Sequence, residues 1–203
     1  LTVLTALPAG VGLSVLAEPI LLLLYPAVPD TARAAAYHLT FLGLACVFVC
    51  LMVAANGVLQ AYGHPLVPVL ALLCGGVLKV VTNYLMVGDP ATGIRGAAVS
   101  TLYCYALIVL IDLIAIARLV PERPGYIRLF ARPVLVTAVM ALAARSGYGL
   151  FCRVLPERWA VLPAIAVAAA VYGILALAIG AVTRTDVVTL PRGEKIADFL
   201  HLR

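Results

Sequence analysis

Residues 35–59 read AAYHLTFLGLACVFVCLMVAANGVL and contain no Asp, Glu, Lys or Arg. A helix rises about 1.5 Å per residue, so this run is long enough to cross the roughly 30 Å hydrocarbon core of a bilayer. Further apolar runs predict spans over residues 1–25, 66–87, 96–117, 133–151 and 160–182, of which 133–151 is the weakest because Arg145 interrupts it. The sequence therefore predicts an all-α polytopic membrane bundle of about six transmembrane helices. It forms one domain over residues 1–183 and leaves 184–203 as a tail.

The composition supports a protein that is dissolved in lipid. Of the 203 residues, 65% are hydrophobic and 11% are charged, and the mean hydropathy is +1.13. Soluble domains carry about 25% charged residues, because their surface must face water. The net charge of +5 is spread over the loops, which argues against nucleic acid as a partner and for membrane lipid. The chain opens inside an apolar run without an initiator Met or a signal peptide, as expected of a piece of a longer protein.

Basic residues are distributed unequally between the two ends of the predicted spans. Short loops make neighbouring spans antiparallel, so successive loops alternate between the two sides of the membrane. One side holds eight basic residues: Arg118, Arg123, Arg128, Arg132, Arg184, Arg192, Lys195 and Arg203. The other side holds five: Arg33, Arg95, Arg145, Arg153 and Arg158. Because cytoplasmic loops carry the excess of Lys and Arg, the tail and the start of the first span are predicted to lie in the cytoplasm.

Lys79 lies deep in the third apolar run, and Asn83 follows one turn later on the same face. An ionisable group near the centre of a bilayer costs roughly 2.5–3.5 kcal/mol on insertion scales. We therefore expect Lys79 and Asn83 to face a cavity or a partner inside the bundle, as candidate substrate-binding residues. The alternative is that the long Lys79 side chain snorkels toward the nearer membrane surface.

Other polar residues also interrupt the apolar runs. Glu18 precedes Pro19 in the first span, and the broken helix of a transporter often lines the pathway; the alternative is a glutamate near the membrane surface beside a structural kink. Asn56 and Gln60 share a face at the end of the second span, where they either line a polar cleft or serve helix packing. Glu18, Asn56 and Gln60 are thus further candidate substrate-binding residues. Asp112 is interpreted as an interfacial residue that pairs with a basic neighbour, with a proton relay as the alternative.

The sequence lacks the motifs of common enzymes and metal sites. It contains no G-x-S-x-G, no phosphate-binding Gly-rich loop with a Lys, no H-E-x-x-H and no Asp-rich metal motif. The five cysteines are interpreted as small apolar residues, since no pair has C-x-x-C spacing. We predict no enzymatic activity, no cofactor and no metal. In the tail, apolar residues recur at roughly helical spacing, which predicts a short amphipathic helix on the inner leaflet.

Several stretches occur in the order and spacing of one transporter family. They are Leu7–Leu13, Leu16–Ile20, Leu23–Tyr25, Val58–Pro65, Lys79–Leu85, Gly93–Thr101 and Leu190–Ile196. The chain resembles the C-terminal part of polysaccharide flippases in the multidrug/oligosaccharidyl-lipid/polysaccharide exporter superfamily, of the stage V sporulation protein B type, which is related to the lipid II flippase MurJ. The resemblance implies that these spans are the last six of a fourteen-helix, two-lobe transporter, and that the N-terminal lobe is missing.

The resemblance also implies a function. The family moves lipid-linked oligosaccharide or polysaccharide precursors for the cell envelope across the bacterial inner membrane by alternating access, and a cationic cavity binds the pyrophosphate. Lys79 is the deeply placed cation of this chain that such a head group would meet, and the last two spans would form part of a groove for the lipid tail. Two other functions stay open. One is a drug or cation antiporter of the same superfamily, which would use acidic residues such as Glu18; the other is a membrane-embedded glycosyl- or acyltransferase.

Overall fold

The computed structural model describes residues 2–89, 92–121 and 126–178, and every regular element in these ranges is an α-helix. The apolar runs form helices because a backbone that leaves water must satisfy its own N–H and C=O groups. The helices are α1 (Thr2–Val15), α2 (Ala17–Leu24), α3 (Pro29–Ala61), α4 (Leu66–Val87), α5 (Arg95–Leu119), α6 (Tyr126–Phe151) and α7 (Val161–Ala178).

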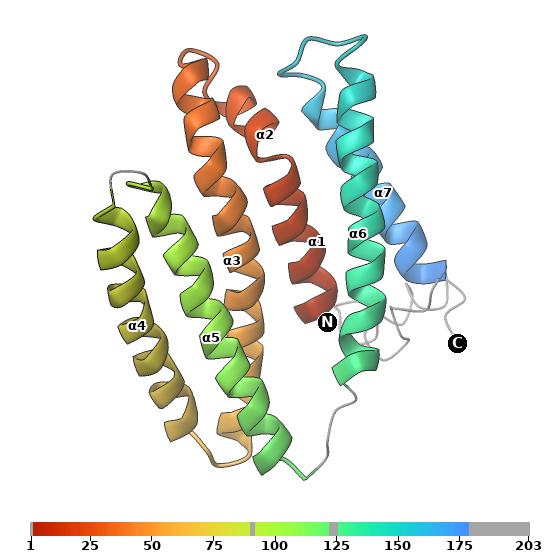
Figure 1. Cartoon of the computed structure of the whole chain (residues 1–203). Coiled ribbons are helices and arrows are strands. Elements are labelled where there is room, and N and C mark those ends of the chain that lie inside the picture. Colours follow the sequence, from red (N-terminus) through yellow and green to blue (C-terminus); the bar gives the residue numbers. More distant parts are fainter. Residues whose placement is uncertain (1, 90–91, 122–125, 179–203) are drawn as a thin grey trace.

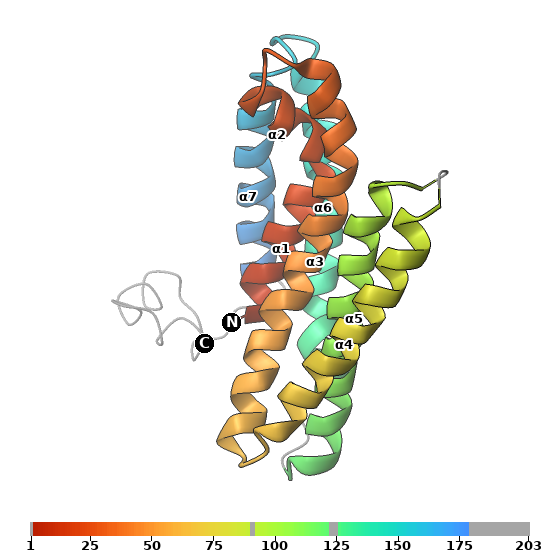
Figure 2. The same cartoon turned by 90° about the vertical axis from the view of Figure 1, so that its left-hand side faces the viewer.

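The long helices stand side by side in the order α4, α5, α3, α1, α6 and α7 (Figure 1). Each helix packs on the next one in this order, and α2 packs on α3 near the upper end of the bundle. The view turned by 90° shows α2 lying across that end, at a marked angle to α1 (Figure 2). The helices α1 and α3 therefore occupy the middle of the molecule.

Small clusters of buried side chains hold neighbouring helices together. The first joins the break between α1 and α2 to α6 and α7 through Leu16, Met140, Ala144, Val161 and Ala168. The second joins α3 and α5 through Ala55, Leu59, Ile116 and Val120. The third joins α4 and α5 through Ala71, Cys104 and Ile108. Many of these residues are small, as expected where packing rather than burial from water drives helix association.

Four helical segments are long and apolar enough to cross a bilayer: Pro29–Ala61, Leu66–Val87, Arg95–Leu119 and Phe130–Phe151. The bent pair α1–α2 makes a fifth candidate, and the apolar segment Val161–Ala176 of α7 is shorter. The outer surface of the bundle is itself apolar, with Leu73, Val80 and Leu142 between 62% and 69% exposed. The chain is therefore an all-helical, multi-pass membrane protein, as predicted, whereas the number of six spans stays a prediction.

Several predicted boundaries differ from the observed ones. Helix α3 begins at Pro29 rather than at residue 35, because proline is suited to a first helical position and the acidic Asp30 favours the first turn. Helix α6 begins at Tyr126, well before the predicted start at Pro133, which lies inside the helix. The predicted end of the sixth span at residue 182 and the tail 184–203 lie outside the described residues.

Candidate functional site

A polar pocket lies beside the break between α1 and α2. Helix α1 ends at Val15, and α2 begins at Ala17 after a bend of 71°. Pro19 in the first turn of α2 has no N–H to offer the Val15 carbonyl, and this missing bond favours the break. The pocket has a volume of about 570 Å³. Its lining residues come from α1, α2, α3 and α6: Val11, Ser14, Val15, Ala17, Glu18, Arg33, Ala36, Tyr37, Thr40, Leu44 and Arg145.

Arg33 of α3 joins several acidic side chains at this pocket. Its guanidinium group lies 3.5 Å from Glu18 of α2, 3.8 Å from Asp30 and 3.9 Å from Glu157 of the α6–α7 loop. The side chains of Arg33 and Glu18 are about half exposed, so each ion pair contributes at most about 1 kcal/mol. Arg33 therefore links α2, α3 and the α6–α7 loop through weak ion pairs.

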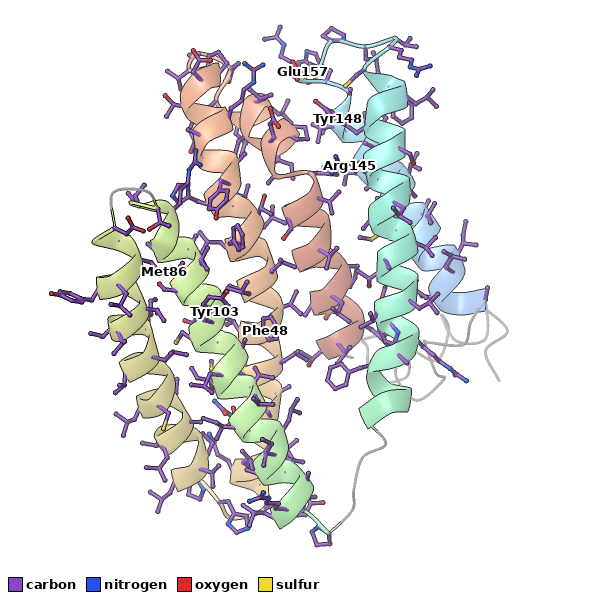
Figure 3. The ribbon with its side chains drawn as sticks, in the orientation of Figure 1. Phe48, Met86, Tyr103, Arg145, Tyr148 and Glu157 are labelled. Atoms are coloured by element: carbon purple, nitrogen blue, oxygen red, sulfur yellow. The ribbon has the colours of Figure 1, made fainter. Side chains whose placement is uncertain are left out.

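Two further arginines approach the pocket. Arg145 lines it from α6 and points toward the α1–α2 break (Figure 3), and it makes no ion pair within the described part of the chain. Arg95, the first residue of α5, lies over the lining residue Tyr37, 5.3 Å from the centre of its ring. Of the residues that line the pocket, Arg33 and Arg145 are cationic and Glu18 is anionic. Arg145 is thus the lining cation that is left for an anionic ligand, because Arg33 already contacts acidic side chains.

Small and hydroxyl side chains hold α1 against α3 next to this pocket. Ser14 Oγ lies 2.8 Å from the Thr40 carbonyl oxygen, and Thr40 Oγ1 donates to the Ser14 carbonyl at 3.3 Å. The two helices approach so closely because Gly10 faces Gly43, and a Cβ atom on either glycine would overlap the other helix. The position of the pocket between α1 and α3 is therefore set by these four residues.

A different face of α1 lines an apolar groove of about 540 Å³ between α1, α6 and α7. Its lining residues include Leu4, Pro8, Gly12, Leu16, Ile20, Met140, Ile165, Ala168 and Tyr172. The Tyr172 hydroxyl donates a hydrogen bond of 2.6 Å to the Leu4 carbonyl. The α1–α2 pair thus separates a polar pocket from an apolar groove, and α6 contributes to both, through Arg145 and Met140.

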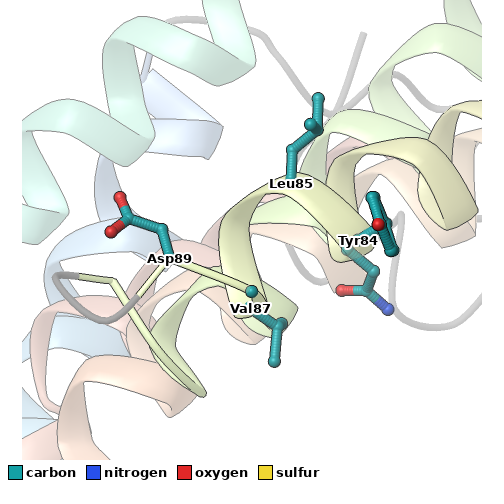
Figure 4. Close-up of a pocket in the computed structure, with 6 residues that line it drawn as sticks. Tyr84, Leu85, Val87 and Asp89 are labelled. Atoms are coloured by element: carbon teal, nitrogen blue, oxygen red, sulfur yellow. The ribbon is translucent and has the colours of Figure 1, made fainter.

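Lys79 and Asn83 lie on α4, at the far side of the bundle from α6 and α7. Asn83 accepts a hydrogen bond of 2.6 Å from the Ser100 hydroxyl of α5. It also lines a shallow hollow with Tyr84 and Asp89 at the end of α4 (Figure 4). Lys79 is partly exposed and makes no ion pair with a residue in the described ranges. These two residues do not join Glu18 in one site, and their role in substrate binding stays a prediction.

Asn56 and Gln60 are also remote from the polar pocket. Gln60 is exposed, whereas Asn56 contacts Asp112 across the interface of α3 and α5. The interpretation of Asp112 as an interfacial residue with a basic partner is wrong, because Asp112 has no exposed surface and its hydrogen-bond partner is Asn56. The sequence distance between Asp112 and Arg118 could not reveal that Asp112 is buried, because its burial depends on the packing of α3 against α5.

In the sequence, Arg33 and Arg95 fall between predicted spans and Arg145 interrupts one, and all three count only as charges that report topology. The signal in the sequence is that all three are assigned to one side of the membrane, and they do lie close to one pocket: Arg33 and Arg145 line it, and Arg95 lies over its residue Tyr37. Within the described residues, no group of three or more His, Cys, Asp or Glu side chains could hold a metal ion.

The chain is similar to the uncharacterized membrane protein YabM of Bacillus subtilis (strain 168). The two are 26% identical over 204 residues, which cover 96% of this chain and 36% of YabM. The chain thus spans about a third of the length of that relative. No family model and no solved structure matches it. The similarity supports a membrane protein.

Proposed function

We propose that this chain is the C-terminal helical portion of a flippase that moves lipid-linked oligosaccharide or polysaccharide precursors across the bacterial inner membrane by alternating access, without catalysis. One observation carries the proposal: a pocket with two arginines and an apolar groove lie against different faces of the same broken helix.

The two surfaces match the two ends of such a substrate. A lipid-linked sugar has an anionic phosphate head, which guanidinium groups bind through paired, charge-assisted hydrogen bonds. Its polyprenyl tail needs an apolar surface, which the groove of α1, α6 and α7 offers. Arg145 has no acidic partner among the described residues and would be the main head-group ligand, while Arg33 would exchange Glu18 and Glu157 for phosphate.

The remaining features of the proposal concern the whole transporter. Broken helices line the pathway in many transporters, where their freed backbone groups meet the substrate. In this proposal the six spans are the last six of fourteen, the C-terminus is cytoplasmic, and the rest of the protein supplies the other lobe. The length of YabM leaves room for that lobe. Glu18 belongs to the proposed head-group site, and Lys79 with Asn83 would act elsewhere along the pathway.

The test is the affinity of the purified chain, in lipid nanodiscs, for polyprenyl diphosphate. The variant Arg145→Gln should weaken binding by about tenfold or more, because it removes a charge-assisted hydrogen bond. Arg153→Gln is the matched control, since Arg153 follows the same helix and does not line the pocket; it should bind like the wild type. Equal affinity for uncharged polyprenol, or unchanged binding by Arg145→Gln, would refute the head-group site.

A further inference from the structure

Asp112 is the buried carboxyl group of the described residues. It lies on α5 with no exposed surface, between the buried residues Ile108 and Ile116 of the preceding and following turns. The other buried polar side chains in the described ranges are hydroxyls, on Ser14, Ser100 and Thr137. A carboxyl group in this position needs a physical explanation, because an ionised acid inside a membrane bundle is costly unless it is paired.

The partners of Asp112 satisfy only part of that need. With its amide nitrogen turned toward α5, Asn56 of α3 donates to Asp112 Oδ2 at 3.2 Å and to the Met52 carbonyl at 3.3 Å. Asp112 Oδ1 is buried and has no hydrogen-bond partner within the described residues. One neutral amide is therefore the only polar group that the helices supply to this carboxyl in the part of the chain that the structure describes.

No cationic side chain of the described residues balances the carboxyl either. The other titratable side chains in the middle of the neighbouring helices are the thiols of Cys46 and Cys50 on α3, and Cys74 and Lys79 on α4. The packing of Gly75 on Ile108 sets the register of α4 along α5, and this register puts Lys79 near Cys104, about two helical turns away from Asp112. On α5 itself, Arg118 is exposed and lies on another face.

We propose that Asp112 is a proton-binding site, and that its carboxyl group is protonated and neutral while α3 and α5 are packed as observed. A neutral carboxylic acid avoids the cost of a buried charge and still accepts the hydrogen bond from Asn56 at Oδ2. When α5 separates from α3, water reaches the carboxyl and takes its proton, which leaves a hydrated carboxylate. Proton binding is thereby linked to closure of the α3–α5 interface. This proposal rests on the contacts of Asp112 and does not depend on the substrate proposed above.

The experiment is infrared spectroscopy of the full chain in lipid bilayers, titrated with pH. The wild type should show the carbonyl band of a protonated carboxylic acid at neutral pH, and Asp112→Asn should lose this band. Asp30→Asn is the matched control, because the Asp30 side chain is 98% exposed; it should keep the band. A wild type without the band at neutral pH, or a band that persists in Asp112→Asn, would overturn the proposal.

A second measurement tests the proposal even if Asp112→Asn changes the fold. It also distinguishes a bound proton from a bound metal cation. The unfolding midpoint of the wild type should fall as the pH rises, because ionisation favours the hydrated, separated state, while Asp112→Asn should lack this part of the pH dependence. Replacing potassium by sodium at fixed pH should leave the band unchanged. A sodium-dependent loss of the band would show that the site binds a monovalent cation instead, which contradicts the proposal.

Discussion

Pro8 leaves the Leu4 carbonyl without its helical donor, and Tyr172 of α7 supplies the missing hydrogen bond. An unpaired carbonyl in an apolar surrounding is costly, since no water replaces the lost partner. One hydroxyl from the last described helix therefore compensates for a proline in the first. This contact also closes one end of the apolar groove, because both Leu4 and Tyr172 line it.

Replacing Tyr172 by phenylalanine should destabilise the chain by about 0.5–1.5 kcal/mol, because the Leu4 carbonyl then has no partner. In a Pro8→Ala background the same substitution should cost less, since the alanine N–H at position 8 can bond to Leu4. The measurement is a double-mutant cycle of unfolding in detergent micelles. Independent, additive effects of the two substitutions would show that the bond is not linked to the proline.

At the scale of elements, α1 and α3 are held together by close approach of their backbones. Gly10 and Gly43 leave no room for a side chain, and the hydroxyls of Ser14 and Thr40 bond across the same contact. Without a hydrophobic effect between helices in lipid, such packing and hydrogen bonding must supply the association.

The variant Gly43→Val should therefore destabilise the bundle by about 1–3 kcal/mol, because its side chain overlaps Ser14 and Gly10. Gly57→Val is the control within the same helix, since nothing lies within 4 Å of the position of its added Cβ. Thermal unfolding in detergent compares the two. An equal loss of stability in both variants would mean that the α1–α3 contact does not explain the effect.

The sequence predicted the helices better than their ends. Apolar runs such as 66–87 are long enough to define a helix by themselves, and α4 has these bounds. The break near Pro19 was also predicted, since proline removes a backbone donor. The start of α3 at Pro29 was missed, because proline and aspartate favour both turns and first helical turns. The choice between the two depends on contacts with α2 that a linear sequence does not contain.

At the scale of the whole molecule, the row of helices brings Arg33 of α3 and Arg145 of α6 to one pocket beside the α1–α2 break. Sequence reasoning could assign these residues to one side of the membrane from alternation of the loops. It could not place them together, because that depends on α1 packing between α3 and α6. The burial of Asp112 was missed for the same reason, since it depends on which face of α5 meets α3.

The central claim is that one amphiphile uses both faces of the broken helix, with its head in the polar pocket and its tail in the apolar groove. The most direct test is photo-crosslinking with a polyprenyl diphosphate that carries a diazirine in its tail, followed by mass-spectrometric mapping of the labelled residues. The label should concentrate on groove residues such as Met140, Ile165 and Tyr172, and unlabelled polyprenyl diphosphate should compete it away. The claim would be contradicted if the outward-facing residues Leu73 and Val80 of α4 were labelled as often as the groove residues.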